Sequence, residues 1–295
     1  MSSAELTAAP SPTAPSPTAV SRRRLSTRLL RSELRLLFGR RRNQALLVVL
    51  ALLPVLIGVA IRVSTGEARP GEGPPFLDRV SGNGLFLAFT GLASVVPFFL
   101  PLTVGVVSGD AVAGEAQTGT LRYLLTVPVS RARLLVVKYA GLVVFGLAAA
   151  VLVAVVGLVV GWALFPTGDV TLLSGTTVPA TEAVGRALLV ALYVTASLAG
   201  LSAIGLAVST FTEVPVAAMA TTVVLAITSQ ILDAIPQLSW LHPWLFTHHW
   251  LSFADLLRSP VPTGAMVDGL QLQAGWILVA LTVAWSRFTT RDITS

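Results

Sequence analysis

The chain has 295 residues, of which 54% are hydrophobic and only 12% are charged, and its mean hydropathy is +0.80. Soluble domains carry about 25% charged residues, so this composition excludes an ordinary soluble protein and predicts an integral membrane protein. The formal net charge is +6. Cysteine is absent, and this absence excludes a disulfide framework, a thiol nucleophile and a thiolate metal site.

The first predicted elements are a tail and an interfacial helix. Residues 1–21 are rich in Pro, Ser, Thr and Ala and have almost no large apolar groups, so we expect a disordered cytoplasmic tail. In the region 22–43, leucines recur at helical spacing opposite arginines, which is typical of an amphipathic helix at the membrane interface. A soluble helix packed on a partner is the alternative. Gly39 is expected to turn the chain into the first span. The arginines predicted to anchor the region among lipid phosphates are Arg28, Arg31, Arg35, Arg40, Arg41 and Arg42.

Six apolar stretches predict membrane-crossing helices, since a helix needs about 20 residues to cross about 30 Å of hydrocarbon. The predicted spans are 44–63, 85–107, 136–165, 184–209, 214–232 and 270–286. Barrel strands are disfavoured because these stretches do not alternate apolar and polar residues. The predicted fold class is therefore an all-α integral membrane protein, with a six-helix transmembrane domain over 44–295.

The arginines predict the orientation. Most of them precede the first span, lie between the second and third spans, or follow the last span. By the positive-inside rule, both termini are therefore expected in the cytoplasm. Anionic lipids at that face account for the net positive charge, so no nucleic-acid partner is expected. Of the 20 basic residues all but Lys138 are Arg, a bias that favours a GC-rich bacterial genome such as that of an actinobacterium.

Small and cyclic residues predict special positions inside the spans. Proline removes a backbone donor, so kinks are expected at Pro54, Pro97 and Pro101, most of all in the second span. Gly157 and Gly161 are four residues apart and offer a close-packing face on the third span.

The outer loops are of two kinds. The loops 64–83 and 167–181 are rich in Gly, Pro and Thr and are expected to be simple connections. The segment 233–269 carries aromatic residues, which prefer the head-group level, so we expect short helices resting in or dipping into the outer leaflet. Its tryptophans are Trp240, Trp244 and Trp250.

The histidines raise the possibility of a metal site. His242, His248 and His249 lie in the outer aromatic segment with Asp255 nearby. Adjacent histidines on a helix point about 100° apart, and no histidine stands at the i+4 position of a zinc protease motif. Packing at the interface is favoured, and no metal is predicted in this chain.

No enzyme motif is present. The chain lacks a Gly-x-Ser-x-Gly elbow, and its single lysine follows valine, which excludes a Gly-x-x-x-x-Gly-Lys phosphate loop. We therefore expect no catalytic residue and no cofactor bound by this chain. Long runs inside the spans lack acidic, basic and histidine residues, which disfavours an ion-driven carrier. Any transport must then draw on an external energy source.

The charged segment 108–135, between the second and third spans, carries the most specific motif. It has the pattern Gly-Asp-x4-Glu-x3-Gly-Thr-Leu-Arg-x-Leu-Leu-Thr-x-Pro-Val-Ser-Arg from Gly109 to Arg131. This pattern resembles the permease subunits of ABC-2 type transporters, and the resemblance extends over the chain. It covers the basic N-terminal helix, six spans, the aromatic outer segment and the terminal residues 288–293. The resemblance implies the transmembrane fold of a type V exporter.

The resemblance also implies partners. The segment would be a coupling helix that seats on a separate ATP-binding subunit, which holds ATP and Mg. Two permease copies, identical or related, would pair above two ATP-binding subunits. The residues to which the resemblance assigns this coupling are Asp110, Glu115, Gly119, Thr120, Leu121, Arg122, Leu124, Leu125, Pro128 and Arg131.

Each coupling residue has an expected role. The two acids would meet the ATPase or fix a helix start, and Gly119 with Thr120 would form a turn. The leucines would be the apolar anchor, Pro128 would stop the helix, and Arg131 would pair with an acid. The alternative is an interfacial helix that only balances its own charges.

The expected function is that of a transmembrane permease subunit in the bacterial cytoplasmic membrane. It would export a hydrophobic or amphipathic substrate. The cargo contacts are expected from the first, second and fifth spans, because the resemblance to ABC-2 dimers places these helices at the dimer interface. The alternative is a non-transporting mechanotransmitter or anchor. In that case ATPase motion would be relayed to an extracytoplasmic accessory protein docked on 233–269.

Overall fold

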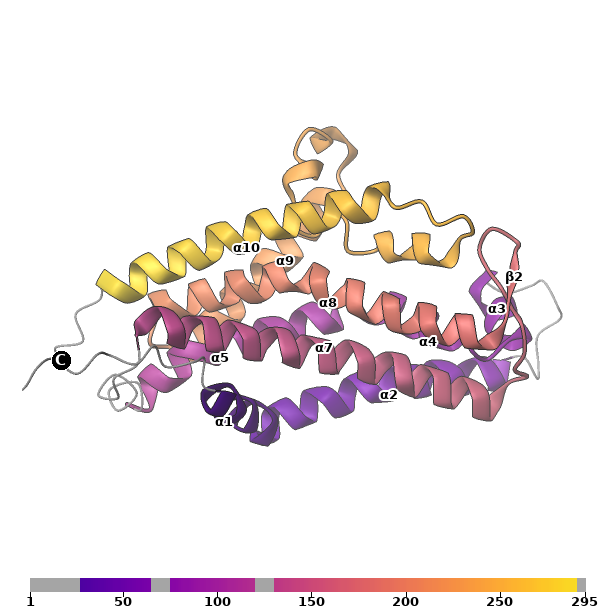
Figure 1. The fold of residues 1–295 in the computed structure, drawn as a ribbon, viewed down its shortest axis with the longest axis horizontal. Helices are drawn as coiled ribbons and strands as arrows, with labels where there is room; N and C mark the ends of the chain where they lie inside the picture. The colour runs from indigo at the N-terminus through magenta and orange to yellow at the C-terminus, as the bar shows by residue number, and fades with distance from the viewer. Residues whose placement is uncertain (1–26, 65–74, 120–129, 291–295) are drawn as a thin grey trace, which may run out of the picture.

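The structure is a computed structural model that describes residues 27–64, 75–119 and 130–290. Its long helices run side by side along one axis (Figure 1), which confirms the predicted all-α architecture. The predicted tail 1–21 lies outside the described residues. In chain order the main helices are α1 (Thr27–Gly39), α2 (Arg41–Ser64), α3 (Pro75–Gly82), α4 (Phe86–Val95), α5 (Phe99–Gln117), α7 (Arg131–Leu164), α8 (Ala180–Phe211), α9 (Pro215–Asp233) and α10 (Gly264–Thr290).

The number of spans agrees with the sequence. By length and composition, α2, α7, α8, α9 and α10 can each cross a membrane, and α4 with α5 makes a sixth span if the bent pair is counted as one. Several helices are longer than predicted. α7 begins at Arg131 instead of 136, and α10 begins at Gly264 instead of 270. Charged residues end an apolar run in the sequence, but a helix continues through them once it leaves the hydrocarbon.

The second span is broken. α4 ends at Val95, α5 begins at Phe99, and the two helices are bent by 55°. Pro97 lies in the break between the two helices. Pro101 lies in the first turn of α5, where backbone N–H groups have no partner within the helix, so its missing N–H costs no helical hydrogen bond. The kink predicted in this span is therefore confirmed. At Pro54, in contrast, the predicted kink does not interrupt the helix, because α2 is continuous.

α8 is the central helix of the bundle. Of its most apolar window, 78% is buried, against 17% to 39% in the four other unbroken spans. It is rich in Ala, Gly and Ser, which let neighbouring backbones approach closely. α5, α7 and α10 all pack against it.

A glycine contact joins α7 to the start of α4. An added Cβ at Gly161 would lie 1.9 Å from Gly84 O, and one at Gly157 would lie 2.6 Å from Ala88 Cα. Only residues without a side chain allow this approach. The close-packing face predicted on the third span is thus confirmed.

α1 is amphipathic, as predicted. Leu37 is buried and Leu34 is half-buried, while the three arginines of α1 are exposed. The apolar side packs on the same chain, where the Phe38 and Phe145 rings are 5.3 Å apart. α1 ends at Gly39 and α2 begins at Arg41, so the predicted region 22–43 is not one helix. The turn is held by the Asn43 side chain, which donates to Leu37 O at 2.8 Å.

The two loops predicted as simple connections contain regular structure, so that prediction is wrong in part. α3 occupies the end of the first loop, and β1 (Val170–Thr171) pairs antiparallel with β2 (Thr177–Val178) in the second. Gly175 has φ +83° in the hairpin turn, a conformation that glycine adopts without strain. The hairpin packs through the buried Leu172. Elements this short leave no readable periodicity.

The aromatic segment between α9 and α10 contains short helices, as predicted. These are the 3-10 helices η1 (Pro236–Leu238), η2 (His242–Trp244) and η3 (Ser252–Leu257). Trp240 and Trp244 are 71% and 69% exposed, but Trp250 is 2% exposed and its ring lies 5.9 Å from that of Phe246. Trp250 is therefore a core residue and not an interfacial anchor. The chain between α9 and η3 projects sideways from the bundle (Figure 1).

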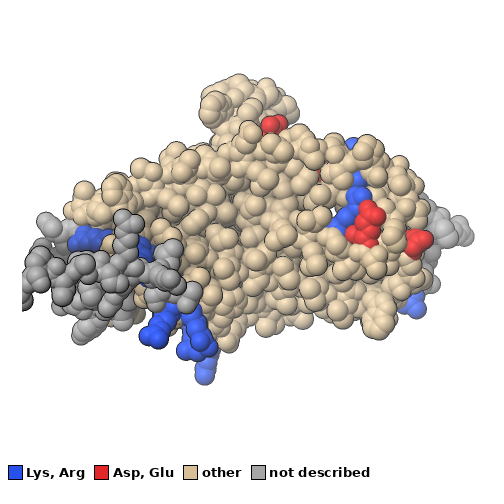
Figure 2. All heavy atoms as spheres, viewed as in Figure 1, with Lys and Arg blue, Asp and Glu red and all other residues tan. Residues whose placement is uncertain are grey.

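Charged side chains are scarce in the middle of the face that Figure 2 shows. Figure 2 shows a broad surface without them, except for an acidic residue at the base of the lateral projection. Basic residues gather at the end that holds α1, and residues of both signs gather at the end that holds α3 and β2. This distribution fits a bundle whose middle lies in hydrocarbon, where charged groups are costly.

Candidate functional site

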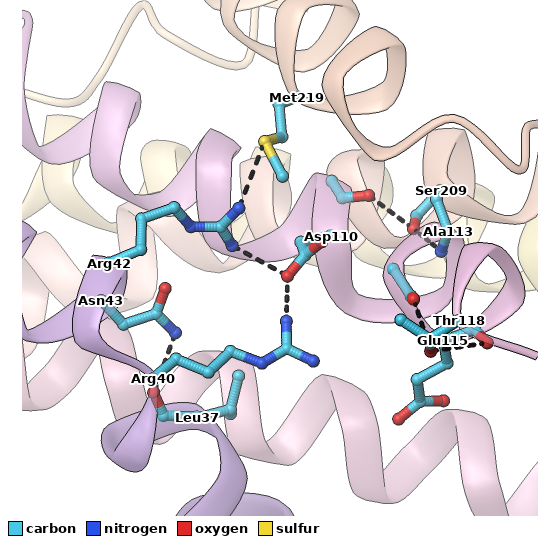
Figure 3. Close-up of polar contacts among 12 residues, drawn as sticks. Leu37, Arg40, Arg42, Asn43, Asp110, Ala113, Glu115, Thr118, Ser209 and Met219 are labelled. Atoms are coloured by element: carbon cyan, nitrogen blue, oxygen red, sulfur yellow. Dashed lines mark hydrogen bonds and ion pairs between the residues drawn. The ribbon is translucent and has the colours of Figure 1, made fainter. Parts of the chain in front are cut away.

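Asp110 lies on α5 and is held by two arginines (Figure 3). Arg40 Nη1 and Arg42 Nη2 both contact Asp110 Oδ2, the latter at 2.8 Å. The carboxylate side chain is 9% exposed, and the arginine side chains are 39% and 43% exposed. Arg42 also lies 3.7 Å from Met219 Sδ on α9. Asp110 thus ties α5 to the α1–α2 turn beside α9.

Lys138 on α7 is the centre of a second ion cluster, which is more deeply buried than the first. Its Nζ lies 2.6 Å from Glu115 Oε1 on α5 and 3.3 Å from Glu33 Oε1 on α1. The lysine side chain is 1% exposed and the two carboxylates are 9% and 13% exposed. Three helices therefore meet at the one lysine of the chain. Removing one member of a buried ion cluster typically costs about 3 to 5 kcal/mol.

These contacts correct the expectation that Asp110 and Glu115 fix the start of a helix. Both lie in the C-terminal half of α5, where the helix dipole does not favour a carboxylate. Basic groups on neighbouring helices stabilise them instead. Their burial is explained within the chain, in line with the alternative of internal charge balance, and contact with an ATPase stays a prediction.

Ser209 on α8 fastens the same part of α5 (Figure 3). Its Oγ donates to Gly109 O at 2.7 Å and accepts from the N–H groups of Val112 and Ala113 at 3.0 and 2.8 Å. An added Cβ at Gly109 would lie 2.6 Å from Met219 N on α9. α5 thus packs tightly between α8 and α9 in its C-terminal half.

α5 ends in a turn at Gly119. This residue has φ +70°, and its N–H donates to Ala116 O at 3.1 Å. Thr118 N donates to Gly114 O at 3.3 Å. Such a left-handed glycine is a common helix stop. The turn predicted at Gly119 is present, and the helix before it is longer than the prediction allowed.

Arg131 marks the start of α7. Ser130 caps that helix, since its Oγ accepts from Arg133 N at 3.4 Å. Arg131 Nη1 donates to Phe288 O and Thr289 O at 2.9 and 3.2 Å. These carbonyls are at the end of α10, where the helix dipole favours a cation. The predicted pairing of Arg131 with an acid stays a prediction.

The structure describes only some of the predicted coupling residues. Those between the two fastened helix ends lie outside the described residues, namely Thr120, Leu121, Arg122, Leu124, Leu125 and Pro128. Among the predicted interfacial anchors, the exposed ones are Arg28, Arg31, Arg35, Arg41 and Arg42. Arg40 and Arg42 bind Asp110, a role that the sequence did not reveal.

The residues from 37 to 293 match the model of the ABC-2 family transporter proteins. This chain belongs to the ABC-2 transporter family. A stretch of 101 residues is 33% identical to the probable ABC transporter permease protein NosY of Stutzerimonas stutzeri, and covers 34% of this chain and 33% of that protein. The resemblance drawn from the 109–131 motif is thereby confirmed at the level of the family.

The ABC-2 permease is a multi-pass protein of the cytoplasmic membrane. In this permease the two ion clusters, the Ser209 contact and the Arg131 contact surround both ends of the 118–130 stretch. These short polar contacts join six helices, namely α1, α2, α5, α7, α8 and α10.

Proposed function

We propose that this ABC-2 permease exports a hydrophobic or amphipathic molecule and is powered by a separate ATP-binding subunit that contacts the 109–131 segment. Two permease copies and two ATP-binding subunits would form the transporter. The observation that carries the proposal is that both flanks of the segment are fastened to transmembrane helices. Asp110 and Glu115 fasten the entering flank, and Arg131 fastens the leaving flank.

The contacts support a path for the movement. A displacement of α5 would act on α2 through Asp110 and on α7 and α1 through Lys138. Charge-assisted hydrogen bonds are about twice as strong as neutral ones, so these links hold their geometry under load. The break at Pro97 would let α5 tilt against α4 without unfolding either helix.

Two neighbouring cavities support an amphipathic cargo. One has a volume of about 390 Å³ and is lined mainly by apolar groups, including Phe89 and Phe253. The other has a volume of about 480 Å³ and is lined by Arg79, Asn83 and Asp169 among others. Phe86 lines both cavities. An apolar and a polar compartment that share a wall suit a molecule with a tail and a polar head.

A photo-crosslinking experiment tests the coupling. A benzophenone amino acid placed at Leu124 is expected to capture an ATP-binding cassette subunit in native membranes, because the motif assigns this leucine to the apolar anchor. The adduct is identified by mass spectrometry. The matched control is Leu173, which is 38% exposed and lies in the β1–β2 hairpin, at the end of the bundle away from the last turn of α5. Leu124 lies outside the described residues and is chosen from the motif alone.

Capture of the same subunit from Leu173, or of lipid alone from Leu124, would contradict the proposed coupling. Cargo is tested separately by the ATPase activity of the purified complex in nanodiscs. Export predicts that amphipathic compounds change the ATPase rate. A rate that responds only to an extracytoplasmic protein would favour the mechanical relay.

A further inference from the structure

The three histidines of the permease gather beside the end of α9. His242 and His248 have ring centroids 5.6 Å apart, and those of His248 and His249 are 4.7 Å apart. Asp233, the last residue of α9, accepts from His248, with Nδ1 and Oδ1 2.5 Å apart. The fold therefore adds a carboxylate that is 15 residues away in the chain.

Three of these side chains converge on one point. Asp233, His242 and His248 each offer one ligand atom, and these atoms lie within 4.8 Å of one another. Two imidazoles and one carboxylate are a donor set that binds zinc and other late first-row divalent cations. Three protein ligands leave a fourth position for water or an added ligand.

We propose that Asp233, His242 and His248 form a binding site for a divalent transition metal such as Zn²⁺.

The surroundings orient the proposed ligands. His242 Nε2 lies 3.1 Å from Ile235 O, to which it donates, so Nδ1 keeps its lone pair. A backbone carbonyl in this position is a common outer partner of a metal-binding histidine. A bound ion would replace the proton between His248 and Asp233. Their ligand atoms would then separate to about 3.3 Å, as two bonds of about 2.0 Å at a tetrahedral angle require.

The site is open to solvent on one side. The side chains of Asp233 and His248 are 24% and 32% exposed. Both line a cavity of about 180 Å³ that Gln230 and Pro97 also border. This volume admits the water or exogenous ligand that the fourth position needs. Since Pro97 lies in the break between α4 and α5, a bound ion would fix the end of α9 beside the bend of the second span.

His249 provides a neighbour outside the proposed set. Burial lowers the pKa of His249, and the charge of His248 lowers it further, while Asp268 and Asp233 act in the opposite sense. His249 is not among the three side chains whose ligand atoms lie close together. Asp255, which the sequence suggested as a ligand, lies instead near Arg258, with Oδ1 and Nε 3.8 Å apart.

The test is metal binding by the full chain in detergent, purified with a tag that has no histidine and stripped with a chelator. Zn²⁺ titration followed by calorimetry is expected to give one ion per chain. Co²⁺ is expected to give the visible absorption of a tetrahedral nitrogen and oxygen site. His242→Ala and Asp233→Asn should each weaken Zn²⁺ binding by about tenfold or more. The matched control His249→Ala should bind as the parent does.

A second measurement separates lost binding from misfolding. Zn²⁺ should raise the thermal unfolding midpoint of the parent and of His249→Ala, but not that of His242→Asn, which keeps a polar side chain at this position. No Zn²⁺ binding by the parent would overturn the site. So would equal loss in His249→Ala, or unchanged affinity in a monodisperse His242→Asn.

Discussion

Replacing Lys138 with methionine is expected to destabilise this permease by about 3 to 5 kcal/mol. The substitution keeps most of the side-chain volume but removes the ammonium group that neutralises Glu115 and Glu33. Two carboxylates would then face each other in a site where the lysine is 1% exposed. Water cannot screen them there, so the cost is close to that of an unpaired buried charge. The measurement is equilibrium unfolding in mixed detergent and SDS.

A surface ion pair supplies the matched control. Arg258 is 57% exposed and lies 3.8 Å from Asp255. Arg258→Met should therefore change the free energy of unfolding by less than about 1 kcal/mol. If Lys138→Met costs no more than this control, the buried cluster does not stabilise the fold.

A double substitution tests the cause of the loss. Glu115→Gln in the Lys138→Met background removes one of the two unneutralised charges. The double variant is expected to be more stable than Lys138→Met alone, although glutamate to glutamine is destabilising in the parent. Simple addition of the two losses would show that packing, and not charge, explains the effect.

The transmembrane helices can be predicted from the sequence because few backbone structures are stable in hydrocarbon. A buried backbone in lipid must satisfy its own polar groups, so long apolar runs become helices and their number follows from counting. The same reasoning finds the broken second span, since proline at position 97 removes a backbone donor in the middle of an apolar run. Helix ends are less certain, as α5 shows by continuing to Gln117.

The pairs of charged residues in the two ion clusters cannot be predicted in this way. Glu33 and Lys138 are 105 residues apart in the chain, and Arg40 and Asp110 are 70 apart. Periodicity identifies the face of a helix but not the helix that faces it. The sequence carries one signal of the Lys138 cluster, because this charge follows four apolar residues, 134–137, and a charge at the edge of an apolar run needs a partner.

The outer aromatic segment shows a second limit. Composition placed its tryptophans at the interface, which fails for Trp250 because a large ring also suits a core. The spacing of the histidines in the chain favours packing over a metal site. Asp233 belongs to the preceding helix and joins them only through the fold. Turns without a regular period leave such convergence unpredictable.

The glycine pair on α7 was half predicted, and it gives the second large effect. Spacing indicated a close-packing face at Gly157 and Gly161, while the partner residue Gly84 came only from the structure. Gly161→Ala is expected to destabilise the permease by about 3 kcal/mol, the upper part of the usual range for overpacking. The added Cβ would lie 1.9 Å from Gly84 O, a backbone atom that cannot rotate away. α4 and α7 would have to separate along their contact.

Gly146 on the same helix is the matched control for that substitution. An added Cβ there has no atom within 4 Å, so Gly146→Ala meets no obstacle and gains up to about 1 kcal/mol of helix propensity. The same chemical change on one helix should thus shift the free energy of unfolding in opposite directions. Unfolding in mixed detergent and SDS measures both. Equal effects of the two variants would mean that α4 and α7 do not touch at Gly161, and that the first half of the second span packs elsewhere.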